Sequence, residues 1–406
     1  MFNLIPSGSV SSASGFLAGA VHAGIKNKDE LDLAILCSEV PCKAAGVFTT
    51  SQIKSAPAIL SQKHIAKGRA QAIVVNSGCA NACMGGQGLA DALGMANLAA
   101  ARLSISPEEV LVASTGVIGV PLPMDKIRAG IPKIKPTREG GHDFCRAIMT
   151  TDTRPKELAV QVDLKGTKFT IGGVAKGIGM IHPNMATMLC FIATDTVVSA
   201  DFLRAALQKA VDCSFNMVSI DGDTSPNDCA FLLANGLAGN EPIGFDNGGD
   251  FQEALTAVCT HLAKSMARDG EGATKLIEVT VERAEDQAWA RQAARTIAGS
   301  PLVKAAIHGS DPNWGRIVAA LGRSGARVRE DRLDAYLNNV CVMKQGCPTP
   351  FSKEEMKLSL SNNDNVLIRL CLNLGDGQAT AWGCDLSEEY VRINSSYTTY
   401  CKRELS

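Results

Sequence analysis

Thr187 lies between a glycine-rich segment, residues 172–179, and an apolar run that begins at Met188. The residue before it, Ala186, is small and leaves its carbonyl open to attack by the Thr187 hydroxyl. If the ester that forms is hydrolysed, the chain is cut and Thr187 gains a free α-amine beside its hydroxyl. An α-amine has a pKa of about 7.7–8.0, so much of it is unprotonated near neutral pH and can act as base for the hydroxyl. The segment therefore indicates a self-cleaving nucleophile, although a glycine turn before an ordinary strand would leave the same pattern.

Further short segments could complete an acyl-transfer site, which needs donors for an oxyanion and groups that hold the substrate. Thr115-Gly116 follows a predicted strand, where a glycine lets backbone N–H groups approach a reacting centre. A strand-to-turn glycine without chemistry fits the same pattern. Lys176 lies among glycines in a predicted loop, where its charge can reach a carboxylate. Glu271 is flanked by two glycines, as an exposed acidic tip suited to an ammonium group. Taken alone, each of these charges is expected to be solvated.

The spacing of cysteine and histidine argues against a metal centre. The 14 cysteines include no CxxC, and no Cys/His group has the spacing of a zinc site. The best metal candidate, Cys79 with Cys83, lacks a partner pair, so no metal ligand is predicted. Most cysteines lie in apolar company, which indicates a reducing, cytoplasmic environment. Among the histidines only His182 is close to Thr187 in the chain, and a structural role is the simpler interpretation.

Composition and charge exclude several classes of protein. Lys and Arg number 40 and Asp and Glu 41, so the net charge of −1 gives no reason to expect a nucleic acid or an anionic membrane as partner. No apolar run approaches the length of a membrane span. Residues 1–8 lack the pattern of a secretory signal or a transit peptide. These features predict a globular, cytoplasmic protein that acts on small molecules.

Hydrophobic periodicity predicts strands and helices that alternate along the chain. A turn around Pro41 is expected to join the first two strands. The predicted strands are residues 31–37, 44–49, 72–76, 109–113, 158–164, 169–171, the run from 187, 217–221, 230–234, 276–282, 340–344, 366–373 and 380–384. The predicted helices are residues 87–103, 142–150, 200–213, 251–266, 286–298 and 314–321, with a surface connection at 121–138. This mixture predicts an α/β protein of helix and sheet layers rather than an all-β barrel.

Together with segments elsewhere in the chain, the Thr187 region resembles the glutamate N-acetyltransferase (ornithine acetyltransferase) family of arginine biosynthesis. The matching segments cover nearly the whole chain: Val75–Gly78, Ala113–Gly119, Ile148–Thr153, Gly172–Asp195, Asp269–Lys275 and Asp311–Arg316. The resemblance implies a sandwich of helices over β-sheets, similar to amide hydrolases with an N-terminal nucleophile. It also implies self-cleavage between Ala186 and Thr187. The products would be an α chain, residues 1–186, and a β chain, residues 187–406, which share one catalytic core and assemble as a heterotetramer of two α and two β chains.

The activity implied by the resemblance is transfer of acetyl from N-acetylornithine to glutamate through an acetyl-threonine intermediate at Thr187. No cofactor is required for that exchange. Thr115 and Gly116 would form the oxyanion hole. The substrate contacts implied by the matching motifs are Thr150, Lys176, Thr187, Glu271, Asn394 and Thr399. The turn before residue 314 has no chemical role that the sequence indicates, and a helix start explains it.

Three departures from the family pattern bear on these roles. Cys79 stands where the family usually has Asn, and this could alter a loop near the site. The segment from Asn394 to Thr399 matches less closely than the others. The family usually ends at the position of Thr399, whereas here residues 400–406 follow.

Alternatives remain open at this point. Water in place of glutamate would make the protein an N-terminal-nucleophile aminopeptidase or amidase. A nucleotide-binding loop at residues 172–179 is disfavoured, because the segment fits neither GxGxxG nor GxxxxGK[ST]. A binding protein without catalysis would stay uncut. The sequence leaves open whether acetyl-CoA is a second donor.

Overall fold

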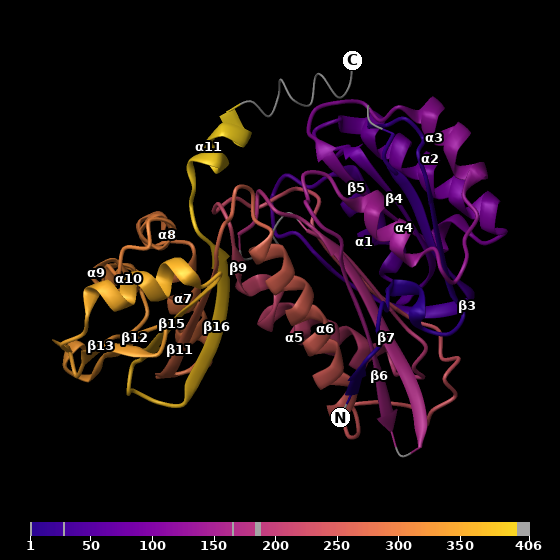
Figure 1. Ribbon diagram of the computed structural model, residues 1–406. Coiled ribbons are helices and arrows are strands. Elements are labelled where there is room, and N and C mark those ends of the chain that lie inside the picture. The colour runs from indigo at the N-terminus through magenta and orange to yellow at the C-terminus, as the bar shows by residue number, and fades with distance from the viewer. Residues whose placement is uncertain (1, 27–28, 165, 183–187, 396–406) are drawn as a thin grey trace.

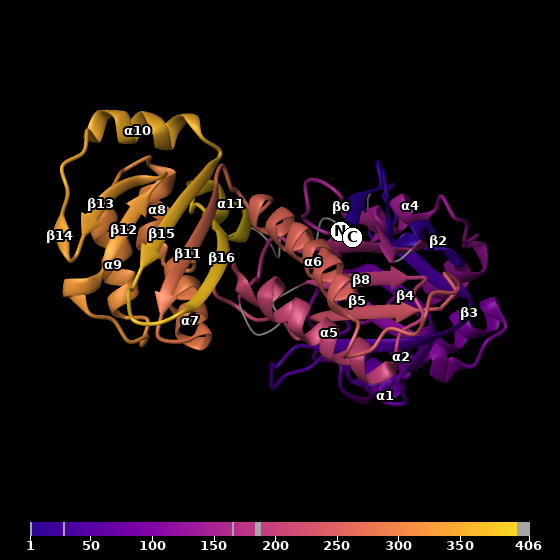
Figure 2. The ribbon, with the colours of Figure 1, turned by 90° about the horizontal axis from the view of Figure 1, so that it is seen from below.

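The computed structural model describes residues 2–26, 29–164, 166–182 and 188–395, and within them two β-sheets are covered by helices (Figures 1 and 2). The first sheet has nine strands in the described part of the chain, and β2 pairs with β3 off the main path. Its strands are, in spatial order, β1 (Phe2–Leu4), β6 (Lys156–Leu164), β7 (Thr167–Lys176), β8 (Leu189–Thr194), β10 (Cys229–Ala234), β3 (Leu33–Phe48), β4 (Arg69–Cys79) and β5 (Val110–Val117), with β2 at Phe16–Val21.

The second sheet is built from residues after 217 and lies to the left of the first in Figure 1. Its order is β14 (Cys347–Pro348), β13 (Val340–Lys344), β12 (Asp334–Leu337), β15 (Asn365–Cys371), β11 (Leu276–Ala284), β16 (Gly377–Cys384) and β9 (Val218–Ser219). Because β9 belongs to this sheet and β10 to the first, the chain crosses between the sheets more than once. The cut predicted between residues 186 and 187 falls in the chain between β7 and β8, which are both strands of the first sheet.

Helices cover both faces of the first sheet and pack against the second. On the first sheet α4 packs against β2 and β3 on one face, while α1, α2, α5 and α6 lie on the other. On the second sheet α7 packs against β11 and β16. The helices are α1 (Ala56–Ile65), α2 (Gly85–Leu103), α3 (Met124–Gly130), α4 (Gly141–Ile148), α5 (Ala200–Cys213), α6 (Gly249–Arg268), α7 (Gln287–Ala298), α8 (Pro301–His308), α9 (Trp314–Gly322), α10 (Lys353–Asn362) and α11 (Glu388–Ser395). The predicted α/β architecture of helix and sheet layers is confirmed.

Strand β8 shows why the apolar run after Met188 forms a core strand. It lies between β7, which is antiparallel to it, and β10, which is parallel. Its side chains alternate between two hydrophobic clusters and are all buried. Phe191 contacts the rings of Phe144 on α4 and Phe231 on β10, with centroids 5.6 and 5.8 Å apart. A continuous apolar run is typical of a strand buried on both faces.

The glycine-rich segment before Thr187 differs from the expected loop. Strand β7 continues through Gly172 and ends only at Lys176. A Cβ atom at Gly172 would lie 2.2 Å from the Ser9 carbonyl oxygen, so glycine is needed for the close approach of the N-terminal segment. Lys176 is therefore fixed at a strand end in the interior rather than carried by a flexible loop.

Two other strands are longer than their sequence patterns indicate. The two strands expected around Pro41 form one strand, β3, whose pairing with β4 has an irregularity between Cys37 and Cys42. Strand β5 runs past Ala113 to Val117 and includes Thr115 and Gly116. The hydrophobic pattern in the sequence ends where polar and glycine residues begin. The strand itself continues, because neighbouring strands still supply partners for its backbone hydrogen bonds. Among the described residues, no helix is long and apolar enough to cross a membrane.

Candidate active site

A buried lysine lies where the ends of β5 and β7 meet the segment that follows α4. Lys176 is 3% exposed. Its Nζ donates to Thr150 Oγ1 at 2.7 Å and to Thr115 Oγ1 at 3.3 Å. Asp152 Oδ2 lies 3.8 Å from the same nitrogen. Burial lowers the pKa of Lys176, and the charges of Asp152 and Glu271 oppose this shift. The three segments that meet here are far apart in the sequence, so the fold has assembled them.

Asp152 is the counter-ion that allows two lysines to be buried together. Its Oδ1 accepts hydrogen bonds from Lys156 Nζ and from the Gly177 N–H, both at 2.8 Å. Burial alone would raise the pKa of Asp152, but Lys176, Lys156 and the Gly177 N–H outweigh it and lower the pKa to about 2. The carboxylate therefore stays charged throughout the neutral range.

Lys156 extends this network to the loop after α6. Its Nζ also contacts Asp269 Oδ2 at 2.7 Å, and neither Lys156 nor Asp152 has exposed side-chain surface. Asp269 in turn accepts hydrogen bonds from the N–H and hydroxyl of Thr153. The chain of charges ties β6, β7 and the segment after α4 to the loop that carries Glu271.

Glu271 is buried, at 6% exposure, and the expectation of an exposed acidic tip is wrong. Its Oε1 accepts a hydrogen bond from Thr151 Oγ1 at 3.0 Å, and its Oε2 accepts one from Asn394 Nδ2 of α11 at 2.9 Å. Its N–H donates to the Ile178 carbonyl at 2.9 Å. The carboxylate can come this close to the segment after β7 because Gly179 has no Cβ, which would lie within 2.6–2.8 Å of the carboxylate atoms. Gly179, rather than the glycines that flank Glu271, thus permits its burial.

Gly116 occupies a backbone position that only glycine can fill. Its φ is +129°, and a Cβ would lie 2.3–2.6 Å from backbone atoms of Gly78 and Cys79. Cys79, where the family usually has Asn, is fully buried in β4 and pairs with Thr115 and Val117. Its Sγ donates to the Val120 carbonyl at 3.0 Å. The departure from the family pattern therefore lies in the strand pairing beside Gly116.

Comparison with known proteins shows the family to which this chain belongs. A family model described as the ArgJ family matches residues 17–399. The chain belongs to the ArgJ family. The "Arginine biosynthesis bifunctional protein ArgJ" of Dehalococcoides mccartyi (strain CBDB1) is 54% identical over 401 residues, which cover 98% of this chain and 99% of that protein. The protein of the same description from Symbiobacterium thermophilum is 52% identical, covering 97% of this chain and 99% of that protein.

A solved ArgJ structure extends the comparison. The crystal structure of the arginine biosynthesis bifunctional protein argJ from Bacillus halodurans is 44% identical, with a TM-score of 0.50 over 51% of this chain and 98% of that chain. The resemblance drawn from the sequence motifs is confirmed, as is the prediction of an arginine-biosynthesis enzyme.

In this ArgJ chain the predicted site residues form two contacting groups. Thr115 and Thr150 contact Lys176, and Asn394 contacts Glu271. Ala186, Thr187 and Thr399 lie outside the described residues. Sequence reasoning missed four residues that join the two groups, although each lies in or beside a matching motif: Thr151, Asp152, Lys156 and Asp269. For Thr151, Asp152 and Asp269, the available signal was an acidic or hydroxyl side chain within the motifs Ile148–Thr153 and Asp269–Lys275, whereas Lys156 lies outside both motifs.

The remaining candidates are His182 and the pair Cys79 and Cys83. His182 contacts the Ser219 hydroxyl through Nδ1 at 3.1 Å, and burial and Arg295 lower its pKa. Cys79 is buried whereas Cys83 is exposed. The prediction that the ArgJ chain holds no metal and needs no cofactor stays a prediction.

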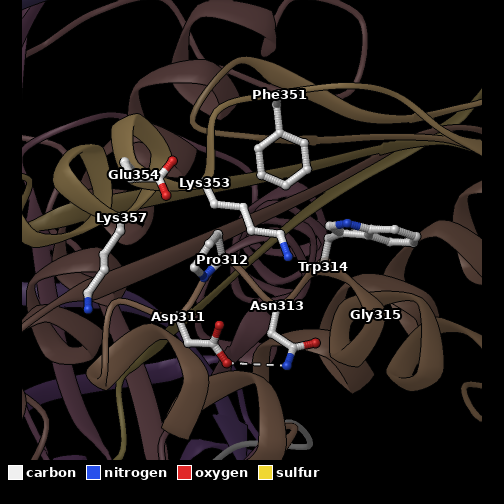
Figure 3. Close-up of a pocket in the computed structure, with 9 residues that line it drawn as sticks. All are labelled: Asp311, Pro312, Asn313, Trp314, Gly315, Phe351, Lys353, Glu354 and Lys357. Atoms are coloured by element: carbon white, nitrogen blue, oxygen red, sulfur yellow. Dashed lines mark hydrogen bonds between the residues drawn. The ribbon is translucent and has the colours of Figure 1, made fainter.

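The motif Asp311–Arg316 lies in the part of the ArgJ chain that forms the second sheet and its helices. As expected it is a helix start, since α9 begins at Trp314. Together with Phe351 and the start of α10, it lines a cavity of about 630 Å³ (Figure 3). The lining residues are Asp311, Pro312, Asn313, Trp314, Gly315, Phe351, Lys353, Glu354 and Lys357. Thr150, Lys176, Glu271 and Asn394, the predicted substrate contacts among the described residues, do not line this cavity.

Proposed function

We propose that this ArgJ chain transfers an acetyl group from N-acetylornithine to glutamate through an ester on Thr187, releasing ornithine and N-acetylglutamate. One observation carries the proposal. The buried ammonium of Lys176 has the hydroxyls of Thr115 and Thr150 as its hydrogen-bond partners, at the strand end where the oxyanion hole is predicted. Its counter-ion Asp152 is shared with Lys156 and lies 3.8 Å away, beyond hydrogen-bond distance, so a substrate carboxylate would add a direct charge-assisted hydrogen bond to the ammonium.

The chemistry assigned to Thr187 balances without a cofactor. Its α-amine takes the hydroxyl proton while Oγ bonds to the acetyl carbonyl carbon. Thr115 and Gly116 stabilise the oxyanion, and one such donor is typically worth about 10²–10³ in rate. The amide C–N bond then breaks, and the leaving amine of ornithine takes the proton from the Thr187 ammonium. The glutamate amine next attacks the ester by the reverse sequence and restores the hydroxyl.

Lys176 and Glu271 would orient the substrate over Thr187. Lys176 would hold a carboxylate and Glu271 an ammonium group, with Thr150, Asn394 and Thr399 as further contacts. Glu271 supports this assignment, because its side-chain hydrogen-bond donors Thr151 and Asn394 are neutral, and an ammonium group would be a charge-assisted partner.

Self-cleavage between Ala186 and Thr187 completes the proposal. Strands β7 and β8, one from each side of the cut, are neighbours in the first sheet, so both products would remain in one core. The solved ArgJ chain supports a cut, since 98% of it is matched although it spans only 51% of this chain. The products, residues 1–186 and 187–406, would assemble as a cytoplasmic heterotetramer of two α and two β chains.

A second donor is favoured by one specific observation. The relatives in the ArgJ family carry the word "bifunctional" in their descriptions. We propose acetyl-CoA as that second donor, since its thioester carbonyl can be attacked by the same threonine.

The experiment that tests the proposal combines intact mass with product analysis. Purified protein should give masses for residues 1–186 and 187–406. With N-acetylornithine alone, acetyl should accumulate on the peptide that begins at Thr187, and rates at varied donor and acceptor should show ping-pong kinetics. Full activity in an uncut chain, or ornithine release only when both substrates are present, would contradict the covalent route. Acetate release that is independent of glutamate would favour an aminopeptidase or amidase.

A further inference from the structure

Asn227 is a buried side chain that the mechanism above does not use. It lies shortly before β10 and is 7% exposed. Its Nδ2 donates to the Ala80 carbonyl at 2.6 Å and to the Ser114 carbonyl at 2.9 Å. These two carbonyls are 147 and 113 residues away in the chain. An amide nitrogen carries two hydrogens, so the two bonds use both of them and fix the orientation of the side chain.

The Ser114 carbonyl belongs to the part of β5 where the oxyanion hole is predicted. It shares a planar peptide unit with the Thr115 N–H, so a hydrogen bond to this carbonyl also fixes the direction of that N–H. Among the described strands β5 pairs with β4 alone, so no second ladder holds it. The Ser114 hydroxyl does not anchor the strand either, because its buried Oγ has no hydrogen-bond partner among the described residues. The Asn227 amide therefore supplies a restraint that β5 otherwise lacks on this residue.

Asn227 also holds the end of β4 through the Ala80 carbonyl. Ala80 directly follows β4, and its N–H donates to the Val117 carbonyl of β5 at 2.9 Å. Just before this contact the pairing of the two strands is irregular at Cys79. One amide thus joins β4 and β5 at the point where their ladder is interrupted.

Buried hydrogen bonds in turn fix Asn227. Its N–H donates to Ser225 Oγ at 3.1 Å, and the Ser225 carbonyl accepts a hydrogen bond from Thr49 Oγ1 at 2.7 Å. The Thr49 N–H donates to the Asp228 carbonyl at 2.9 Å. Thr49 and Ser225 are both buried, and the segment leads into β10, which lies between β8 and β3. Asn227 is therefore a fixed link from the centre of the first sheet to the ends of β4 and β5.

We propose that Asn227 is a positioning residue for the oxyanion hole at Thr115 and Gly116, an inference that rests on the proposed function. It acts through the backbone of β5 and not by contact with substrate. Donors to an oxyanion must be in place before the charge develops, and a displacement of about 1 Å can cost on the order of 10² in rate. Because the oxyanion does not exist in the bound substrate, losing this restraint should slow acetyl transfer and leave donor binding nearly unchanged.

Asn240 provides a matched control, because its amide makes the same kind of contact away from the predicted site. It is 5% exposed, and its Nδ2 donates to the Val197 and Glu241 carbonyls at 3.1 and 2.8 Å. Its Oδ1 accepts a hydrogen bond from the Val197 N–H at 2.8 Å. Removing either amide takes away two hydrogen bonds to backbone carbonyls, so the two variants should lose comparable stability.

The test compares Asn227→Ala with Asn240→Ala as fully cut protein. Single-turnover acetylation is measured at varied N-acetylornithine, and urea denaturation shows whether the two losses of stability are alike. In Asn227→Ala the maximal rate should fall about tenfold to a hundredfold, since donors are displaced rather than removed. The half-saturating donor concentration should change by less than about twofold, because Lys176 and Glu271 are retained. Asn240→Ala should keep both values within about twofold of the wild type.

The outcomes separate the inference from the proposed function. Equal maximal rates in the two variants, or a change confined to the half-saturating donor concentration, would overturn the inference and leave the proposed function intact. Wild-type protein that takes up no acetyl would overturn the proposed function and the inference with it. An Asn227→Ala chain that folds but stays uncut, beside a cut Asn240→Ala, supports the inference, because cleavage passes through the same kind of oxyanion. If Asn227→Ala does not fold, Asn227→Ser and Asn240→Ser are compared by the same criteria, since a serine hydroxyl can donate to only one of the two carbonyls.

Discussion

The charged side chains of the two sheets form similar ion pairs in very different surroundings. Around the first sheet, Lys156 contacts Asp152 and Asp269 at 2.8 and 2.7 Å with no exposed surface on the lysine side chain. In the second sheet, Lys344 contacts Asp334 at 3.0 Å, but the lysine side chain is 54% exposed. Taking charges out of water costs free energy that their attraction seldom recovers. The difference indicates that the buried network serves positioning of the site rather than net stability.

Buried polar atoms that lack a hydrogen bond also differ between the regions around the two sheets. Among the described residues, buried side-chain oxygens that accept no hydrogen bond lie in the first sheet or its adjoining loops: Asn76 Oδ1, Asn81 Oδ1, Ser114 Oγ and Glu157 Oε2. Native proteins leave few such atoms, and each has a cause such as backbone strain, a catalytic role, or an ordered water or ion as partner. The cavity in Figure 3, in contrast, is lined by exposed charges of the second half.

The largest effect is expected at the nucleophile. In the proposed mechanism Thr187→Ala removes the hydroxyl that would attack both the Ala186 carbonyl and the acetyl donor, so the chain should stay at full length and transfer no acetyl. Intact mass and an ornithine-release assay measure the two losses together. Thr194→Ala, which removes a buried hydroxyl that contacts Thr196 at the other end of β8, should be cut and active. A cut or active Thr187→Ala protein would assign the nucleophile elsewhere.

The next prediction compares the two kinds of ion pair directly. Lys156→Met leaves Asp152 and Asp269 buried without their shared cation, and should lower the free energy of unfolding by about 3–5 kcal/mol. Lys344→Met removes an exposed cation, and should lower it by less than about 1 kcal/mol. Urea denaturation of both variants measures the difference. Equal losses would mean that the buried contacts of Lys156 contribute no more to the free energy of unfolding than the exposed Lys344 pair does.

Much of the fold could be predicted from the sequence, because most of it follows from hydrophobic periodicity. Helix α5 was expected at residues 200–213 and is found there, since its apolar side chains recur at helical spacing and are buried. Strand β7 was not predicted at its full length. The glycines in it indicated a loop, whereas contact with the Ser9 backbone requires them in a strand. Periodicity reports which side chains are apolar, and it carries no information about a neighbouring backbone.

The site was predictable only as a set of residues and not as an arrangement. Motifs marked Lys176 and Glu271, but nothing in the sequence showed that both are buried or that Asp152 compensates the lysine. Burial of a charge depends on partners that are distant in the chain, and those partners become visible only in the fold. Asn227 was missed for the same reason, since the carbonyls that its amide contacts are 113 and 147 residues away.

Substrate recognition should show an intermediate effect. Lys176→Met and Glu271→Gln would each remove one of the charge-assisted hydrogen bonds proposed to hold the substrate, worth on the order of 1.5–3 kcal/mol. We expect kcat/KM for N-acetylornithine to fall by roughly one to two orders of magnitude in each variant. Cleavage is checked first by intact mass, because Lys176 precedes Thr187 by few residues. The matched control is Lys357→Met in the cavity of Figure 3, which should leave kcat/KM unchanged. A cleaved Lys176 or Glu271 variant with unchanged kcat/KM would remove that residue from the site.

The smallest effect is expected in the acid dependence of stability. The pKa of Asp152 is about 2 in the folded chain against an ordinary value of 3.8. A carboxyl whose pKa is lowered by folding contributes stability that is complete above its unfolded pKa and is lost as pH falls through its folded pKa. Asp152 should therefore contribute about 2 kcal/mol at neutral pH, lost progressively between about pH 4 and 2. Unfolding by urea, measured at several pH values, should show this slope in the wild type and a reduced slope in Asp152→Asn.

Asp331 has its pKa lowered by Arg329 on the exposed surface, where water and salt screen the pair. Asp331→Asn should keep nearly all of the wild-type slope, and an equal reduction in both variants would mean that burial of the Asp152 network does not set the acid dependence.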